Sequence, residues 1–133
     1  MPRYTALVTV LAILFYFYTA ARVPQARRRF GLKAPVMMTG SNPEFDRIFR
    51  VQMNTLEWLP IFLPLLWMFA FYISDIWAAA LGVVWVAARA WYMVGYTQAP
   101  QKRAPGFGLQ VAVCVVLLIG VLIGIFNSFA HGG

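Results

Sequence analysis

The sequence predicts an all-α fold, an integral membrane four-helix bundle, from three observations. Of its 133 residues, 62% are hydrophobic and 11% are charged, with a mean hydropathy of +0.71, whereas soluble domains carry about 25% charged residues. Four apolar stretches approach the roughly 20 residues that cross a bilayer. Most of the basic residues that give the net charge of +7 lie between these stretches. These patterns predict one membrane domain, residues 1–133, and no nucleic-acid partner.

The predicted membrane spans cover residues of about 4–21, 48–73, 76–96 and 107–130. The first has no charged residue, and because a basic segment follows its long apolar run, we expect a retained helix and not a cleaved signal peptide. The second contains Pro60 and Pro64, which membrane helices accommodate when neighbouring helices satisfy the freed backbone groups. Arg89 interrupts the third. The fourth contains the single cysteine, Cys114, which we interpret as a small packing residue.

The connections between the spans differ in charge, and this difference predicts the orientation. The second connection, at Ser74 and Asp75, has no Lys or Arg, whereas the third, residues 97–106, has Lys102 and Arg103. The first connection, residues 22–47, contains Arg22, Arg27, Arg28, Arg29, Lys33 and Arg47. The positive-inside rule places the first and third connections in the cytoplasm and both termini on the opposite side. Because proline and glycine punctuate the first connection, we expect it to form no long helix of its own.

Polar residues gather where the second span begins, in the stretch RIFRVQMNTLEWLP, residues 47–60. At about 100° per helical residue, Arg47, Arg50, Asn54 and Glu57 fall on one stripe, and Gln52 points to nearly the opposite side. A glutamine that faces lipid is costly, so we expect a second subunit to cover Gln52.

The third span carries a second polar face. Arg89, Tyr92 and Tyr96 follow the spacing i, i+3 and i+7, and Arg103 lies seven residues beyond Tyr96. Ionisable groups inside membrane spans are costly and favour a functional hypothesis. Because both polar faces end at the same side of the membrane, we predict a polar pocket at the cytoplasmic interface.

Structural interpretations of these residues remain open. Interfacial aromatic anchors are an alternative explanation for Trp58, Tyr92 and Tyr96. A buried ion pair between Glu57 and either Arg50 or Arg89 is another. The arginines after the first span are also typical of topology signals or lipid-headgroup contacts.

The side chains of the predicted pocket indicate the chemistry of its ligand. Guanidinium groups bind carboxylates through paired charge-assisted hydrogen bonds, and a single glutamate can hold an ammonium. An arginine beside a thiol lowers the pKa of that thiol and stabilises the thiolate. Glutathione has two carboxylates, one amine and one thiol and fits this inventory, as do other zwitterionic peptides. With a single cysteine, the sequence lacks the cysteine spacing of a metal site, and we predict none.

Two segments resemble a known family: EFDRIFRVQMNTLEWLPIFLPLLW and ARAWYMVGYTQAPQKRAPG. They are similar to the membrane-associated proteins in eicosanoid and glutathione metabolism, the MAPEG family, and closest in motif to its glutathione-conjugating members. The resemblance implies a homotrimer of four-helix subunits that binds glutathione at each subunit interface near the cytoplasmic face. It also implies a glutathione transferase that conjugates a lipophilic electrophile from the bilayer, with glutathione peroxidase activity as a further expectation.

The resemblance also implies roles for individual residues. Arg103 would hold the glutathione thiolate, and Arg28 is the other catalytic candidate. The implied glutathione-binding residues are Arg27, Arg50, Gln52, Asn54, Glu57, Trp58, Arg89, Tyr92 and Tyr96. Arg27 and Arg28 are expected to reach the site from the loop after the first span. Trp58 replaces a tyrosine of an enzymatic member and so removes one phenol.

Two alternative functions remain at this point. One is a non-catalytic protein that binds lipid or a partner, like the lipoxygenase-activating member of the family, and Arg103 is the residue that separates the two. The other is a small-molecule transporter, against which the clustering of charge at one membrane face argues. The sequence leaves the lipophilic substrate unidentified, and we expect a bacterial inner membrane as the location.

Overall fold

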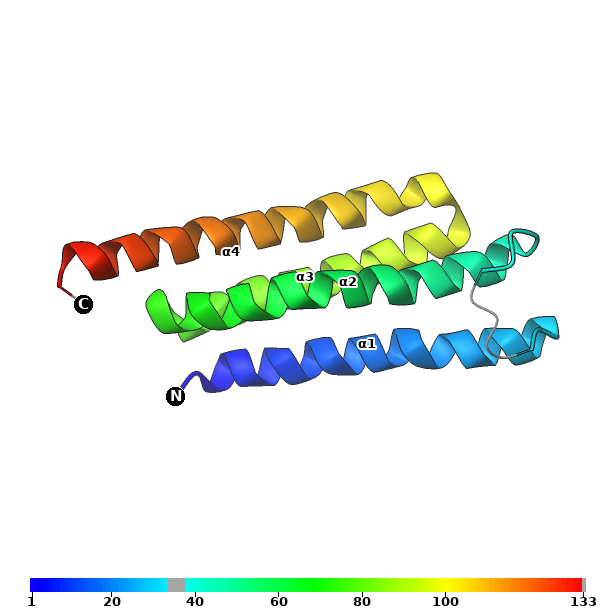
Figure 1. Cartoon of the computed structure of the whole chain (residues 1–133), viewed down its shortest axis with the longest axis horizontal. Helices are drawn as coiled ribbons and strands as arrows, with labels where there is room; N and C mark the ends of the chain where they lie inside the picture. The colour runs from blue at the N-terminus through cyan, green and yellow to red at the C-terminus, as the bar shows by residue number, and fades with distance from the viewer. Residues whose placement is uncertain (34–37, 133) are drawn as a thin grey trace.

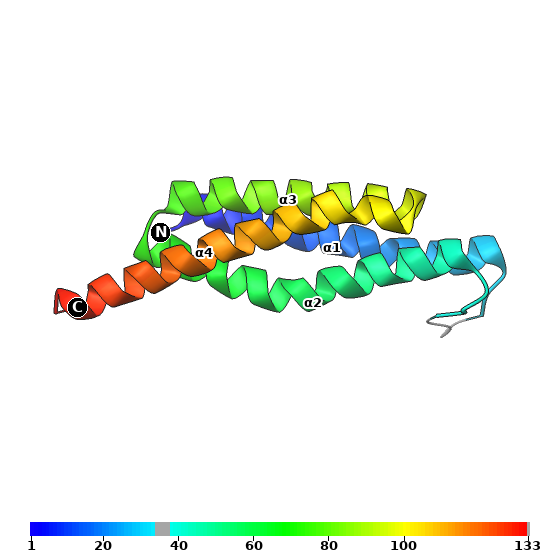
Figure 2. The same cartoon turned by 90° about the horizontal axis from the view of Figure 1, so that it is seen from above.

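The computed structural model describes residues 1–33 and 38–132, and these residues form four long helices and one 3-10 turn with no strand. The helices are α1 (Arg3–Phe30), α2 (Pro43–Tyr72), α3 (Asp75–Gln98) and α4 (Ala104–Ala130), with the 3-10 turn η1 (Pro100–Arg103) before α4. Each of the four is long and apolar enough to cross a membrane. Figures 1 and 2 show them side by side, with the end of α4 extending past the α2–α3 turn. The predicted all-α class is confirmed.

Helix α1 extends past the end of the predicted span at residue 21 and continues through Pro24 to Phe30, while the described residues of the connection that follows form no long helix of their own before α2. The added turns are stable because Val23 and Ala26 are buried against the start of α2. Gly31 follows the last residue of the helix, and its φ of 69° is the left-handed conformation typical of a helix C-terminus. The predicted span stopped at residue 21 because hydropathy measures the apolar character of a segment and not the length of its helix. Residues 34–37 of the predicted connection lie outside the described residues.

Helix α2 begins in a tightly hydrogen-bonded segment. The Asn42 side chain accepts a hydrogen bond from the backbone N–H of Phe45 at 3.1 Å and so caps the helix. The carboxylate of Asp46 accepts hydrogen bonds from the N–H groups of Thr39 at 2.8 Å and Gly40 at 2.9 Å. These bonds fold the chain before α2 back over the start of the helix.

The core lies along α3, which contacts each of the other three long helices. The rings of Phe62 and Trp85 stack with centroids 4.0 Å apart, and Trp85 donates a hydrogen bond from Nε1 to Oε1 of the buried Gln110 at 2.9 Å. Gly82 lets α1 and α2 approach α3, because a Cβ there would contact Val8 and Leu66 closely. Helix α2 also contacts the other three long helices, and its direct packing on α3 brings the polar face of α3 against the polar stripe of α2.

Candidate functional site

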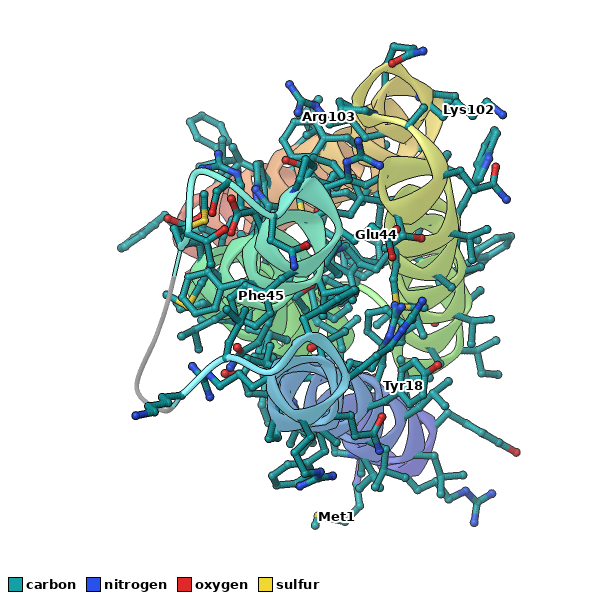
Figure 3. The ribbon with its side chains drawn as sticks, turned by 90° about the vertical axis from the view of Figure 1, so that its right-hand side faces the viewer. Met1, Tyr18, Glu44, Phe45, Lys102 and Arg103 are labelled. Carbon is teal, nitrogen blue, oxygen red and sulfur yellow. The ribbon has the colours of Figure 1, made fainter. Side chains whose placement is uncertain are left out.

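A cavity of about 530 Å³ opens where the start of α2, the end of α3, η1 and the start of α4 meet. Its volume is within the range of small-molecule sites, about 300–1,000 Å³. The lining residues are Met38, Phe49, Arg50, Met53, Asn54, Glu57, Tyr92, Tyr96, Arg103, Ala104, Phe107 and Gly108. Figure 3 views the bundle from this end, with Arg103 on the side of η1 towards α2 and Lys102 on the outer side. The predicted polar pocket is therefore present within a single chain.

The α2 wall contains Arg50, Asn54 and Glu57, which share one helical face as the spacing predicts. The Oδ1 atom of Asn54 is buried and has no hydrogen-bond partner among the described residues. An unpaired buried acceptor is unfavourable, so this atom favours a ligand with a donor. The alternative of a structural ion pair is not supported, because Glu57 forms none with Arg50 or Arg89 in the described part of the chain.

The α3 wall contains Tyr92 and Tyr96, whose ring centroids are 5.6 Å apart. The guanidinium carbon of Arg103 lies 5.2 Å from the centroid of the Tyr96 ring, in a cation–π contact. Tyr92 and Tyr96 share one face of α3, as the spacing predicts, and the contact places Arg103, whose alignment the sequence did not predict, beside Tyr96. Both rings are buried, whereas Arg103 is exposed at the cavity mouth.

Two glycines fix the position of Arg103, and sequence reasoning missed both. A Cβ at Gly95 would overlap the backbone carbonyl of Lys102, and a Cβ at Gly106 would overlap the backbone nitrogen of Tyr92. Because both obstacles are backbone atoms, no side-chain rotation relieves them. Each glycine holds the segment around Arg103 against α3. The available signal was a small residue within otherwise bulky helical sequence.

Arg89 is buried behind the α3 wall and does not line the cavity. Its Nη2 donates a hydrogen bond to Oγ1 of Thr55 at 2.8 Å. Its guanidinium carbon lies 4.5 Å from the centroid of the Tyr92 ring and 5.8 Å from that of Trp85. Arg89 therefore contacts the cavity wall from the interior of the bundle and does not face the cavity itself.

Gln52 has a partner that the sequence did not predict. It lies on the opposite side of α2 from Arg50, as predicted, and its Nε2 donates a hydrogen bond to the hydroxyl of Tyr16 on α1 at 3.2 Å. Gln52 is only half-buried by this contact, and its expected cover by a second subunit stays a prediction. Trp58 also lies off the cavity, where its ring packs edge-on against Phe107 at 5.7 Å and supports the cavity wall.

The predicted arginines near the first connection do not line the cavity of their own chain. Arg27 and Arg28 lie in the last turn of α1, not in a loop, which corrects the expectation for both. Arg27 contacts the Phe45 ring at 5.9 Å, and Arg28 is exposed. Arg47 approaches two backbone carbonyl oxygens at the end of α3, each at 3.5 Å, where a cation is favoured.

The sequence did not predict the apolar part of the lining. Phe49, Met53 and Phe107 line the cavity beside the polar groups, and Met38 reaches it from the folded-back segment before α2. Residues of this kind have the same pattern as core residues, so no sequence signal separates them. Among the described residues, no group of three or more His, Cys, Asp or Glu lies together. The cavity thus combines cationic, phenolic, amide and apolar surfaces.

Comparison with known proteins gives a consistent result over most of the chain. The sequence model of the MAPEG family matches residues 5–123. Human microsomal glutathione S-transferase 2 is 39% identical over 124 residues, which cover 93% of this chain and 83% of the relative. An uncharacterised protein of Synechocystis is 43% identical over 120 residues, covering 90% and 86%. Bovine leukotriene C4 synthase is 36% identical over 118 residues, covering 88% and 77%.

Proposed function

This chain belongs to the MAPEG family and is an integral membrane protein, and we propose that it is a glutathione transferase that conjugates a lipophilic electrophile. One observation carries the proposal. The cavity brings the arginine expected to hold a thiolate, Arg103, beside the polar stripe of Arg50, Asn54 and Glu57. Relatives named as a glutathione transferase and as leukotriene C4 synthase support the same chemistry.

Each end of glutathione has a complementary group in the cavity. Arg50 fits a carboxylate through paired hydrogen bonds, and Glu57 fits the ammonium group. The buried Oδ1 of Asn54 needs a donor, which a peptide N–H of glutathione would supply. Tyr92 and Tyr96 add phenol groups between this stripe and Arg103. In this assignment, glutathione lies with its thiol towards Arg103.

The reaction follows from placing the thiol next to Arg103. The thiol releases its proton to water, and the positive charge of Arg103 stabilises the resulting thiolate. The thiolate sulfur then forms a bond to an electrophilic carbon, while the bond from that carbon to its leaving group breaks and the leaving group takes the electron pair. Phe49, Met53 and Phe107 give this substrate an apolar wall, as expected for a substrate from the bilayer.

Peroxidase activity would use the same thiolate. Attack on the O–O bond of a lipid hydroperoxide breaks that bond and gives glutathione sulfenic acid and an alkoxide, which takes a proton from water to become an alcohol. A second glutathione then converts the sulfenic acid to glutathione disulfide and water. No additional residue is needed for this reaction.

We propose a homotrimer because the predicted glutathione-binding residues lie on different faces of the chain. Gln52 and Arg27 are off the cavity, and Gln52 is on the reverse side of α2 from Arg50. A neighbouring copy can bring this second face, with Arg28, to the open side of the cavity. Covering that side would exclude water from Arg103 and strengthen its interaction with a thiolate. Light scattering or native mass spectrometry of the purified protein measures the subunit number, and a monomer contradicts this proposal.

The orientation is also part of the proposal. The basic residues in the last turn of α1 and in η1 are at the cavity end, so the positive-inside rule places the cavity at the cytoplasmic face and both termini on the opposite side. A bacterial inner membrane is the proposed location. Labelling of single cysteines near each terminus in intact cells tests this orientation.

The test of the function is glutathione conjugation by protein purified in detergent, with a generic aromatic electrophile as substrate. Wild type is expected to form the conjugate, and Arg103→Ala is expected to lose activity while it still binds an S-alkyl glutathione. Equal rates for the two proteins would contradict the catalytic role of Arg103. Glutathione binding without any conjugation or peroxidase activity would instead favour a non-catalytic lipid- or partner-binding protein.

A further inference from the structure

Arg89 combines a full positive charge with complete burial. Its exposed fraction is 0%, and among the described residues it is the one charged residue that is buried. Nη2 has one partner, Thr55, but Nε and Nη1 are buried without hydrogen-bond partners in the described residues. A buried charge without compensation is strongly unfavourable, so its presence within a membrane helix requires an explanation.

The acidic residues of the chain do not supply the missing negative charge. The sequence contains four of them. Glu44 pairs with Arg29 at 3.5 Å, and the carboxylate of Asp46 accepts hydrogen bonds from the N–H groups of Thr39 and Gly40 in the segment before α2. Asp75 lies at the opposite end of the bundle, bound to the first turn of α1. Glu57 lines the cavity and forms no ion pair with Arg89.

The charge of Arg89 is directed at the cavity through one aromatic ring. Tyr92 lies between them, since its ring contacts Arg89 at 4.5 Å and also lines the cavity. Thr55 anchors Arg89 from the α2 side, because its hydroxyl accepts from Arg89 and donates to the carbonyl of Val51 at 2.7 Å. This chain of contacts ties the two cavity walls together. It also holds the Arg89 guanidinium directly behind the Tyr92 ring, so that one aromatic ring separates it from the cavity.

Arg89 differs from the arginines that line the cavity. Arg50 and Arg103 are exposed in the chain, so water and salt reduce the effect of their charges. Arg89 has no contact with solvent, and its field is therefore screened far less. An anion in the cavity would be the natural counter-charge.

We propose that Arg89 is a positioning residue that acts through Tyr92: it holds the Tyr92 ring at the cavity wall, and its unscreened charge favours a thiolate over a neutral sulfur in the bound glutathione. This inference rests on the proposed function. A unit charge on the order of 10 Å away, at an effective dielectric constant of about 20, changes the affinity for an anion by about tenfold, or the pKa of the bound thiol by about one unit.

Several other groups affect the same thiol and must be held constant. They are Arg50 and Glu57 from α2, Tyr92 and Tyr96 from α3, and Arg103 from η1. Cys114 of α4 is close enough to interact electrostatically with Arg89. The experiment therefore compares ligands that differ only at sulfur, within one variant at a time.

The experiment measures the affinity of each protein for glutathione sulfonate, which is anionic at the sulfur position, and for S-methylglutathione, which is neutral there. It also measures the pH midpoint of the ultraviolet absorbance of the bound thiolate. In Arg89→Met, the preference for the sulfonate is expected to fall about tenfold and the midpoint to rise by about one pH unit. Arg89→Lys keeps the charge and is expected to restore most of both values.

A matched control removes a hydrogen bond of the same kind far from the cavity. Thr9→Val deletes the bond that Trp67 Nε1 donates to the Thr9 hydroxyl at 2.9 Å. This variant is expected to lower the unfolding temperature without changing the ligand preference or the midpoint. Equal losses for both ligands in Arg89→Met, with an unchanged midpoint, would show a purely structural role and overturn the inference.

A second measurement covers the case in which Arg89→Met does not fold. In Arg103→Gln, Arg89 remains, so the bound thiol is expected to keep a midpoint below that of free glutathione, and raising the salt concentration should change it little. A midpoint equal to that of free glutathione in this variant would also overturn the inference. If wild type binds neither ligand, the proposed function itself fails, and that result is distinct from a failure at Arg89.

Discussion

The two ends of the bundle use their polar groups differently. At the α2–α3 turn, the carboxylate of Asp75 accepts hydrogen bonds from the backbone N–H groups of Thr5 at 2.8 Å and Tyr4 at 3.1 Å. The Ser74 hydroxyl accepts one from the N–H of Trp77 at 3.3 Å and caps α3. These side chains satisfy backbone groups at helix starts that would otherwise lack partners.

At the cavity end, polar atoms are buried without such partners. Asn54 Oδ1, Arg89 Nε and Arg89 Nη1 all lack them among the described residues. Apart from Nε2 of Gln110, which lies in the core beside Trp85, the unpaired buried side-chain atoms of the described residues lie at or directly behind the cavity. Their position there favours a ligand, even though both ends of the bundle have similar helices. Substitutions at the two ends should therefore separate stability from activity.

The largest effect on the conjugation rate is expected for Gly95→Ala, at the cavity end of the bundle. The added Cβ would overlap the Lys102 carbonyl and displace Arg103, and a misplacement of about 1 Å can lower a rate about a hundredfold. Gly82→Ala is the matched control, because its Cβ meets side chains of Val8 and Leu66 away from the cavity. Conjugation rate and unfolding temperature are measured for both. If Gly95→Ala and Gly82→Ala lost the same activity per folded protein, the expected difference between the cavity and the rest of the bundle would be contradicted.

The next largest effect is expected for Glu57→Gln. Losing a carboxylate that holds an ammonium removes a charged hydrogen bond, worth about 1.5–3 kcal/mol, so glutathione affinity should fall at least tenfold. Calorimetry with glutathione and with an analogue that lacks the amine provides the control. The substitution should leave affinity for the analogue nearly unchanged. If both affinities fall equally, Glu57 does not bind the amine.

A smaller effect is expected for Trp58→Phe. Trp58 lies behind Phe107 and does not line the cavity, so the substitution removes packing area but no ligand contact. Affinity for glutathione should change by no more than about threefold, within the range of a lost aromatic contact of about 0.5 kcal/mol. A loss above tenfold in equilibrium binding would show that Trp58 contacts the ligand directly.

The smallest effect on activity is expected at the other end of the bundle. Asp75→Ala removes the acceptor of two N–H groups of α1, so the unfolding temperature should fall by a few degrees. Glutathione affinity and conjugation rate should not change, since the cavity lies at the opposite end. Reduced affinity in the folded variant would show that the two ends are coupled.

The sequence predicted the polar half of the cavity because polar residues within an apolar helix are unambiguous. Once the spans were defined, the helical repeat placed Arg50, Asn54 and Glu57 on one face. The same repeat aligned Tyr92 and Tyr96. No knowledge of the neighbouring helices was needed for these predictions.

The remaining features depend on contacts between helices, which a repeat does not encode. The partner of Gln52 is Tyr16 of α1, and only the packing of α1 on α2 reveals it. Arg89 looked like a cavity residue because it shares a face with Tyr92, but its depth places it behind the wall. Phe107 has the pattern of a core residue. The end of α1 was missed since hydropathy does not detect a helix that continues into water.

The length of α1 determines where residues can be inserted into the chain without moving Arg27 and Arg28. Arg27 and Arg28 belong to a continuous helix that ends at Phe30, so their height above the membrane and their direction are properties of that helix. A residue inserted within α1 would rotate them by about 100° and raise them by about 1.5 Å. A residue inserted after Gly31 would leave both in place. Variation in chain length is therefore tolerated on one side of that glycine and disruptive on the other.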